Sequence, residues 1–244
     1  MRRFGLIGYP LQGSLSPRLF SAAYAGAWPY EFIETPDFEQ AWARFEAEYE
    51  AVNVTAPFKE NAFRRVAQLE EAGRGWLSDA VRVIGATNLL VKTGRGVEAH
   101  NSDYLGVRAV LSGAGFGPGS RAVVAGWGGA AKAVAAAARD LGMQVIVCNR
   151  TLREPFLRPL SELPRLAAES DLLVYTLPEA IAETERLACP AILEANYKCP
   201  CLCGHAPLYL SGRDWILAQA VAGYALMTGA EPDGEALRRA AGMV

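Results

Sequence analysis

Short apolar runs alternate with longer helix-prone stretches along most of this chain. In the first half we expect strands near Gly5, Phe32, Val52, Leu89 and Val97, with helices between most of them. Residues 92–96 contain the glycines of a tight turn, which predicts a hairpin between the last two strands. This alternation predicts an α/β fold.

The second half of the chain contains a β-α-β pattern. An apolar run over residues 121–125 precedes an alanine-rich, helix-prone segment over residues 129–141, and a second apolar run covers residues 144–148. Glycines lie between the first run and the helix. The pattern predicts a Rossmann-like domain with a parallel sheet that binds a dinucleotide.

Each small residue of the glycine turn has its own expected role. Gly126 permits the tight turn, Gly128 lets the backbone approach a pyrophosphate, and Ala131 allows the helix to pack closely on the strand. The N-terminus of the helix then offers N–H groups and a positive dipole to the phosphates. Trp127 lies inside this turn, where it either narrows the approach of the cofactor or covers it.

The end of the second strand indicates which dinucleotide binds. An acidic residue there usually contacts the ribose 2′-hydroxyl of NAD, but here Arg150 occupies this region, with Arg153 close by. A guanidinium matches a 2′-phosphate in charge and geometry, so we expect NADP. The alternative is that Arg150 is a solvated loop residue. The expected cofactor-binding residues are Gly126, Gly128, Gly129, Ala130, Ala131, Asn149, Arg150 and Thr151.

Two serines follow the first strand. Ser16 precedes Pro17, which suits the N-cap of a helix over residues 18–26. If the segment before Ser16 is extended, Ser14 and Ser16 point to the same side, so their hydroxyls can grip a small anion such as a carboxylate. Helix capping alone is the alternative.

Lys59 is a candidate for proton transfer. It follows a buried strand over residues 51–54 and lies in the first turn of a helix that Pro57 opens and that extends toward Gln68. A cation in a first turn opposes the helix dipole, and a broken local rule of this kind is expected at functional sites. Asp103, if it lies nearby, would orient the amine and share in proton transfer. The alternative is an exposed lysine that tolerates a small penalty.

These motifs together resemble the shikimate dehydrogenase family over most of the chain. The matching segments are the Ser-x-Ser of Ser14 and Ser16, residues 53–59 (Asn-Val-Thr-Ala-Pro-Phe-Lys), residues 85–88 (Gly-Ala-Thr-Asn), residues 101–103 (Asn-Ser-Asp), the Gly126 turn, residues 149–151 (Asn-Arg-Thr) and residues 217–220 (Leu-Ala-Gln-Ala). Residues 174–180 depart from the family pattern beside the cofactor, at Tyr175, Leu177 and Ala180.

The resemblance implies a reversible, NADP-dependent reduction of 3-dehydroshikimate to shikimate, in the shikimate pathway of aromatic amino acid biosynthesis. It implies that Lys59 and Asp103 are the catalytic pair. The implied substrate-binding residues are Ser14 and Ser16 for the carboxylate, Thr55, Asn88 and Gln219 for ring hydroxyls, and Ser102, which stands where the family commonly has threonine. Two alternatives stay open: an NAD(P) enzyme acting on quinate or aminoshikimate, and a non-catalytic shikimate-binding module.

Two domains are expected, an N-terminal α/β substrate domain and the Rossmann-like NADP-binding domain. If Gln219 reaches the substrate, the C-terminal helices return to the first domain, which makes that domain discontinuous. We expect the substrate domain at residues 1–103 and 213–244, and the NADP-binding domain at residues 104–212. The length of 244 residues, 51% of them apolar, suffices for two modest domains.

Composition narrows the class of partner. A net charge of −2 gives no nucleic-acid footprint, and no apolar run is long enough to span a bilayer. Without a signal-peptide cleavage pattern, we expect a cytoplasmic monomer or homodimer that binds only small molecules. Cys199, Cys201, Cys203 and His205 suggest zinc, but residues two apart on an extended strand lie about 6 to 7 Å apart. This is wide for thiolates that share one ion, so reduced thiols and no metal are the favoured interpretation.

Overall fold

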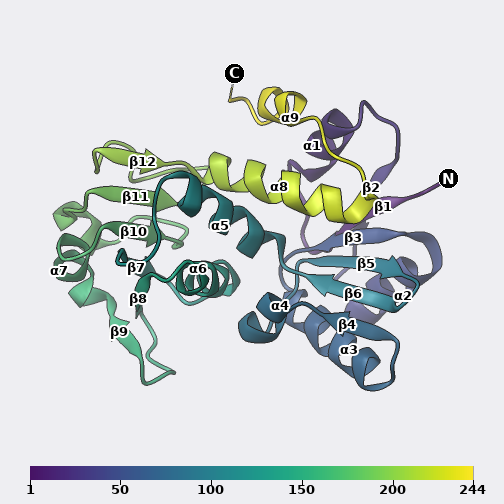
Figure 1. Cartoon of the computed structure of the whole chain (residues 1–244), viewed down its shortest axis with the longest axis horizontal. Helices are drawn as coiled ribbons and strands as arrows, with labels where there is room; N and C mark the ends of the chain where they lie inside the picture. Colours follow the sequence, from purple (N-terminus) through teal and green to yellow (C-terminus); the bar gives the residue numbers. More distant parts are fainter. Residues whose placement is uncertain (244) are drawn as a thin grey trace. The chain divides into compact units, whose positions relative to one another are not determined.

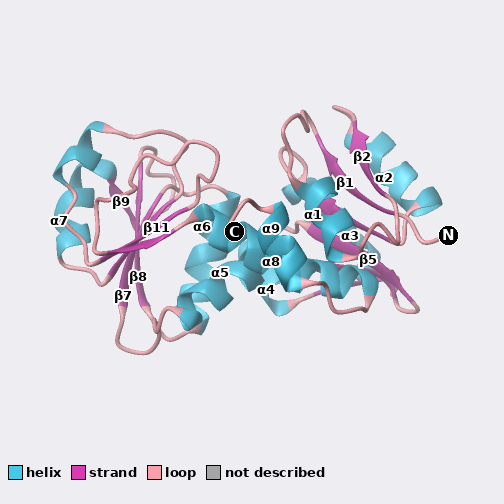
Figure 2. Cartoon of the chain, turned by 90° about the horizontal axis from the view of Figure 1, so that it is seen from above, coloured by secondary structure: helices cyan, strands magenta, loops and turns pink. Residues whose placement is uncertain are grey.

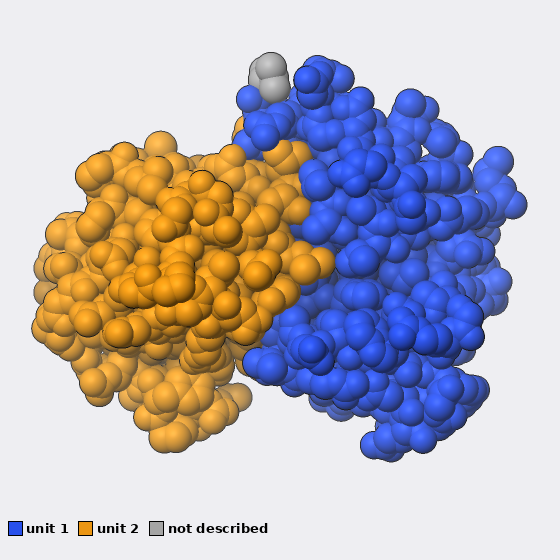
Figure 3. All heavy atoms as spheres, in the orientation of Figure 1, with its two compact units in different colours: residues 1–102, 219–244 blue, residues 103–218 orange. Residues whose placement is uncertain are grey.

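The computed structural model describes residues 1–243 and divides into two compact units, coloured separately in Figure 3. Unit 1 is Met1–Ser102 with Gln219–Val244, and unit 2 is Asp103–Ala218. The predicted domains, residues 1–103 with 213–244 and residues 104–212, are functional assignments, and they stay a proposal.

Unit 1 is built on a mixed six-stranded sheet in the order β2-β1-β3-β5-β6-β4 (Figure 1). Its strands are β1 (Phe4–Gly8), β2 (Tyr30–Glu34), β3 (Ala51–Val54), β4 (Gly75–Leu77), β5 (Leu89–Thr93) and β6 (Gly96–His100). Strands β1, β2 and β3 are parallel, whereas β5 is antiparallel to both β3 and β6. The five predicted strands and the hairpin between β5 and β6 are confirmed, while β4 was not predicted.

The helices of unit 1 cover both faces of this sheet. They are α1 (Ser16–Ala23), α2 (Phe38–Glu48), α3 (Lys59–Glu71), α4 (Asp79–Ile84) and α9 (Gly234–Ala240), together with the C-terminal part of α8 (Gly212–Thr228). The side chain of Asp37 caps α2 by accepting from two N–H groups, and α2 then buries Trp42 and Phe45 against the sheet. Phe20 of α1 packs on Phe4 of β1, with ring centroids 5.1 Å apart.

Unit 2 contains a fully parallel six-stranded sheet in the order β12-β11-β10-β7-β8-β9. Its strands are β7 (Arg121–Ala125), β8 (Gln144–Asn149), β9 (Leu157–Pro159), β10 (Leu172–Tyr175), β11 (Ala191–Glu194) and β12 (Leu208–Leu210). Counted from β7, this is the strand order of a doubly wound dinucleotide-binding sheet. The predicted Rossmann-like domain with a parallel sheet is therefore confirmed.

The two faces of this sheet hold separate hydrophobic cores. Helices lie on both sides of the sheet (Figure 2). The helices of unit 2 are most of α5 (Ser102–Gly113), α6 (Gly129–Asp140), α7 (Leu163–Ala168) and the N-terminal part of α8, with short 3₁₀ turns at Leu160–Glu162 and Ala182–Arg186. Alternate residues of β7 face opposite ways, because side chains alternate along a strand. Val124 thus packs with Val134 of α6, whereas Val123 packs with Leu166 of α7.

Glu194, at the end of β11, is a fully buried carboxylate that organises the long connection after it. It accepts hydrogen bonds from the backbone N–H groups of Cys201 (2.6 Å) and Leu202 (3.0 Å), and from the hydroxyl of Tyr209 (2.7 Å). Buried charges are tolerated where several donors satisfy them, so this carboxylate fixes a loop that has little secondary structure.

Within residues 1–243, none of the helices combines the length and the apolar character that a bilayer span requires.

Removal of the Glu194 carboxylate should therefore destabilise unit 2. Glu194→Ala leaves buried N–H groups without an acceptor, and we expect a loss of about 3 kcal/mol in the free energy of unfolding. Thermal unfolding measures this. The control is Glu185→Ala, because Glu185 is exposed and, like Glu194, precedes the cysteine loop in sequence. Equal midpoints for the two variants would contradict the role given to Glu194.

Candidate active site

The motif residues of unit 1 lie at one edge of its sheet. Parallel strands β1 and β3 both end there, and β5, running the other way, begins there opposite the end of β3. Strand β6 returns to the same edge, where His100 pairs with Leu89. The loops that follow β1, β3 and β6, and the residue that precedes β5, therefore meet at this edge because of strand direction alone.

Ser14 and Ser16 lie together at this edge, although for a different reason than predicted. The hydroxyl of Ser14 donates to Oγ of Ser16 over 3.2 Å, and it accepts from the N–H of Ser16 over 3.3 Å. Leu15 between them is helical (φ −80°, ψ −12°), so the segment is not extended. Leu15 also occupies the N-cap position, and no side chain caps α1, so the predicted capping by Ser16 is wrong.

Two tyrosines that were not predicted as site residues lie beside this motif. Tyr224 of α8 donates its hydroxyl to the carbonyl oxygen of Ser16 over 3.2 Å, and Tyr30 of β2 donates to Oδ1 of Asn53 over 2.8 Å. Burial raises the pKa of both phenols, and a hydrogen bond with the Ser16 side chain opposes that shift in each. The hydroxyl of Tyr224, on a helix far away in sequence, thus holds the backbone of Ser16.

Thr55 and Lys59 follow β3. The N–H of Thr55 donates to the carbonyl oxygen of Ile7 over 2.8 Å, and any side chain at Gly8 would collide with the Thr55 methyl group. Helix α3 begins at Lys59, after a turn closed from Phe58 N–H to Thr55 oxygen (3.0 Å). The prediction that Pro57 opens the helix is wrong, since Pro57 lies within this turn, but the placement of Lys59 in the first helical turn is confirmed.

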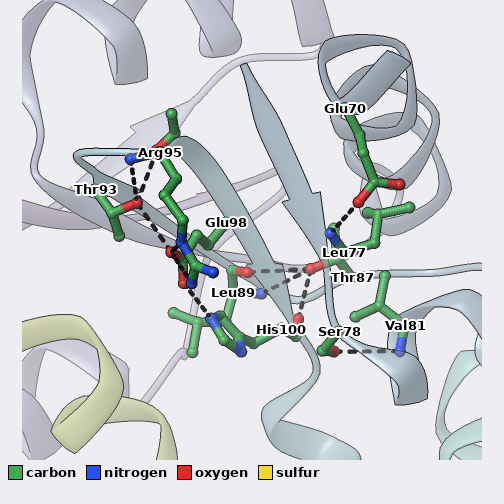
Figure 4. Close-up of polar contacts among 11 residues, drawn as sticks. Glu70, Leu77, Ser78, Val81, Thr87, Leu89, Thr93, Arg95, Glu98 and His100 are labelled. Carbon is green, nitrogen blue, oxygen red and sulfur yellow. Dashed lines mark hydrogen bonds and ion pairs between the residues drawn. The ribbon is translucent and has the colours of Figure 1, made fainter. Parts of the chain in front are cut away.

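Thr87 connects the backbone at Lys59 with the backbone at His100, and Figure 4 shows its hydroxyl beside His100. Its N–H donates to the carbonyl oxygen of Lys59 over 3.1 Å. Its buried hydroxyl lies 2.5 Å from the carbonyl oxygen of His100, to which it donates, and the N–H of Asn88 donates to the same oxygen over 3.3 Å. The His100 carbonyl therefore ties the start of β5 to the end of β6, just before the Asn-Ser-Asp motif. Thr87 was part of a matching motif but had no predicted role.

Asn88 and Ser102 form a buried pair at this junction. The N–H of Ser102 donates to Oδ1 of Asn88 over 2.6 Å, while Nδ2 of Asn88 donates to the Ser102 hydroxyl over 3.1 Å. The amide oxygen of Asn88 is therefore engaged by the protein backbone. An amide nitrogen carries two hydrogens, so Asn88 meets a ligand as a donor.

Gln219 approaches the same pair from α8. Gly223 packs so closely on Ser102 that an added Cβ would lie 3.1 Å from Cβ of Ser102. Residues four apart in a helix share one face, so Gln219 lies one turn from this contact on the face that meets Ser102.

Asp103 is the first residue of unit 2 and lies in the first turn of α5. Its carbonyl oxygen accepts a hydrogen bond from the indole nitrogen of Trp215 over 2.9 Å. An acidic residue suits this end of a helix, because the helix dipole is positive there.

The predicted cofactor residues all line one cavity of about 430 Å³ in unit 2. The cavity lies at the ends of β7, β8 and β10 and at the start of α6. It is lined by Gly126, Trp127, Gly128, Gly129, Ala130, Ala131, Asn149, Arg150, Thr151, Thr176 and Leu177. The structure thus brings all eight residues of the sequence prediction to one place, together with three more.

The small residues of the turn fit a bound pyrophosphate. Gly126 has φ +107°, and a side chain there would collide with Oγ1 of Thr176. Gly128 precedes α6, and an added Cβ would have no protein atom within 4 Å, so the backbone faces open space where phosphates bind at helix N-termini. Ala131 is fully buried in the core beside β7 and β8.

Arg150 supplies the charge of the cavity. Among the described residues that line it, Arg150 alone is charged and none is acidic. Nδ2 of Asn149 donates to the Thr151 carbonyl oxygen over 2.9 Å, which shapes the turn that carries Arg150. A cation without a competing carboxylate favours a ligand with an additional phosphate.

Comparison with known proteins decides the family. The sequence profile of the shikimate dehydrogenase substrate binding domain matches residues 6–90. A shikimate dehydrogenase (NADP(+)) from Halobacterium salinarum is 34% identical over 188 residues, which cover 70% of this chain and 67% of the relative. Another, from Archaeoglobus fulgidus, is 28% identical over 99% of this chain and 98% of the relative. This chain belongs to the shikimate dehydrogenase family.

Solved structures of the family agree along the whole chain. Shikimate 5-dehydrogenase from Thermus thermophilus, in complex with NADP(H) and shikimate, is 29% identical with a TM-score of 0.81, over 99% of this chain and 98% of that one. Shikimate dehydrogenase from Mycobacterium tuberculosis is 26% identical with a TM-score of 0.84, over 100% of both chains. The predicted family and fold class are confirmed.

The segment that departs from the shikimate dehydrogenase pattern is well packed. Tyr175 ends β10 as a fully buried core residue, and its hydroxyl donates to the carbonyl oxygen of Glu179 over 2.6 Å. Thr176 and Leu177 then line the cofactor cavity, and the Thr176 hydroxyl donates to the Ala125 carbonyl oxygen over 2.7 Å. The Tyr175 hydroxyl therefore holds the loop that follows β10, while Thr176 and Leu177 form part of the cavity wall.

The clustered cysteines, Cys199, Cys201 and Cys203, are free thiols in a loop. Cys199 and Cys203 are exposed thiols, whereas burial raises the pKa of Cys201 to about 11. Over residues 1–243, no group of three or more His, Cys, Asp or Glu side chains is placed to hold a metal ion.

The Thr87 hydroxyl should be needed for the stability of unit 1. Thr87→Val keeps the shape of the side chain but leaves the His100 carbonyl with one donor fewer, and we expect a loss of about 1 to 2 kcal/mol in unfolding free energy. Urea unfolding measures the change. Thr151→Val, at an exposed position, is the matched control, and a loss as large in this control would remove the special role of Thr87.

Proposed function

We infer that this chain is an NADP-dependent shikimate dehydrogenase that reduces 3-dehydroshikimate to shikimate reversibly. The observation that carries this conclusion is the cavity at the Gly126 turn, where Arg150 is the charged residue beside a glycine turn and a helix N-terminus. The relatives named shikimate dehydrogenase (NADP(+)) and the Thermus structure with NADP(H) and shikimate support it.

The substrate side uses the sheet edge of unit 1. We assign the paired hydroxyls of Ser14 and Ser16 to the substrate carboxylate, since two adjacent donors suit an anion. We assign Thr55, Asn88 and Gln219 to the ring hydroxyls. We also assign Ser102 to the substrate site. Its backbone N–H and its hydroxyl both hydrogen-bond to the Asn88 amide, so Ser102 orients Asn88 in addition to its own role at the substrate.

Proton transfer is assigned to Lys59 and Asp103. NADPH supplies the hydride that reduces the C3 carbonyl carbon of the substrate. The Lys59 ammonium donates a proton to the C3 oxygen as that oxygen gains negative charge, and Asp103 orients the ammonium group. In the reverse direction the same lysine accepts the proton of the C3 hydroxyl.

Cofactor binding is assigned to the cavity of unit 2. The N–H groups around Gly128, Gly129 and Ala130 would hold the pyrophosphate at the start of α6, and Arg150 would bind the 2′-phosphate. Asn149 and Thr151 hold the turn in which Arg150 lies. These residues fit NADP better than NAD because no carboxylate among the described lining residues accepts a ribose 2′-hydroxyl.

The cellular setting follows from this activity. The reaction belongs to aromatic amino acid biosynthesis, and we place the enzyme in the cytoplasm as a monomer or homodimer. A net charge of −2 supports a protein without nucleic-acid or membrane partners.

The test of this function is the oxidation of shikimate, followed by the near-ultraviolet absorbance of NADPH formed from NADP⁺. Quinate and NAD⁺ are run in parallel. We expect shikimate with NADP⁺ to be the preferred pair. Preference for quinate would move the chain to a related activity, and shikimate binding without turnover would leave a binding module.

Lys59→Ala should lower kcat by about a hundredfold or more, because the C3 oxygen loses its proton donor, while NADPH affinity stays nearly unchanged. Lys92→Ala, on β5 of the same unit, serves as the control, since Lys92 donates to the carbonyl oxygen of Glu46 on the surface. Near-normal turnover in the Lys59 variant would remove this residue from the mechanism.

Arg150→Ala should weaken NADPH by about tenfold or more and NADH much less, because only NADPH carries the 2′-phosphate. Arg186→Ala, an exposed arginine elsewhere in unit 2, is the control for general charge effects. Equal losses for the two cofactors would refute the assignment of Arg150.

A further inference from the structure

An aromatic pair lies at the cofactor cavity and has no role in the function proposed above. Trp127, inside the glycine turn, lines the cavity, and its ring packs edge-to-face on Phe156 with centroids 5.2 Å apart and planes at 78°. Phe156 is 47% exposed although it is a large apolar side chain. An exposed aromatic residue beside a cavity is a recognised feature of ligand sites.

The contact with Phe156 places Trp127 on a particular side of the cavity. Strand β7 lies between β8 and β10 in the sheet, so the cavity has a β8 side and a β10 side. Phe156 belongs to the connection between β8 and β9, which also carries Arg150. The β10 side is formed by Thr176 and Leu177. The indole is therefore held toward the side on which Arg150 lies.

The Trp127 indole differs in size and chemistry from the other residues that line the cavity. Most of them are glycine, alanine or short polar residues, and among those the structure describes Trp127 alone is aromatic. Nucleobases stack on aromatic rings or lie against them, whereas glycine and alanine offer little surface for such contact. In a dinucleotide site the adenosine half lies near the end of the second strand, which here is β8.

We propose that Trp127 is a cofactor-binding residue whose indole contacts the adenosine half of NADP(H), with Phe156 as the positioning residue that braces it. This inference rests on the proposed use of NADP. Trp127 then supplies apolar contact for the base, while Arg150 supplies charge for the 2′-phosphate attached to the same nucleoside. The bulky residue in the turn is a part of the binding site and does not obstruct it.

Equilibrium binding to the full chain tests the proposal without any turnover. The probes are NADPH and adenosine 2′,5′-bisphosphate, which carries only the adenosine half with its 2′-phosphate. Binding is followed by calorimetry and by tryptophan fluorescence. We expect the wild type to bind both probes with a loss of fluorescence. Trp127→Ala should weaken both probes by about tenfold, and Trp127→Phe, which retains a ring, should weaken them much less.

The fluorescence provides a readout that a merely structural role would not change. The loss on binding should largely disappear in Trp127→Phe and persist in Trp76→Phe, a matched change in unit 1. Phe156→Leu should weaken adenosine 2′,5′-bisphosphate while leaving shikimate affinity unchanged.

Two results would overturn the proposal. Unchanged or tighter binding of both probes by Trp127→Ala would mean that the indole only fills the turn. A fluorescence loss that survives in Trp127→Phe would place the contact at another tryptophan. A wild type that binds neither probe would instead defeat the proposed use of NADP itself, so the two failures are distinguishable.

Discussion

The carbonyl oxygen of His100 is the point on which the substrate side of this protein depends. It accepts from both the Thr87 hydroxyl and the Asn88 N–H, while the Thr87 N–H donates to the carbonyl oxygen of Lys59. One buried junction therefore sets the position of the helix that begins at Lys59, of the Asn88 amide and of the strand that leads into Ser102. Buried polar groups of this kind specify a unique arrangement only when each has a partner.

Strand direction explains why both halves of the chemistry are found in loops. In unit 2 all strands are parallel, so the ends of β7, β8 and β10 form one cavity edge. In unit 1 the antiparallel β5 brings its first residues, rather than its last, to the edge where β1 and β3 end. The backbone thus places short polar segments side by side, and the side chains on those segments determine what binds.

The sequence predicted the features that local pattern controls. The β-α-β unit, the glycine turn and the five strands of the first half follow from apolar periodicity and from glycine, and each lies where predicted. Capping by Ser16 was wrong because Leu15, with no sequence signal, adopts a helical conformation. Strand β4 has only three residues, too few to show a period.

Contacts between distant residues were beyond such reasoning. Tyr224 meets Ser16 across 208 positions of sequence, and Glu194 binds a loop whose course no pattern predicts. All eight predicted cofactor residues lie around one cavity because they come from two adjacent loops of one β-α-β unit. The roles of Lys59, Asp103 and the substrate-binding residues stay proposals.

The most direct measurement of the central claim is the reduction of 3-dehydroshikimate by the purified protein. NADPH absorbance is followed after the substrate is added, NADH is run in parallel, and the product is identified by chromatography. The account predicts rapid loss of NADPH, little loss of NADH, and shikimate as the product. No change in the absorbance of either cofactor, in a protein that binds shikimate and NADPH, would contradict the account.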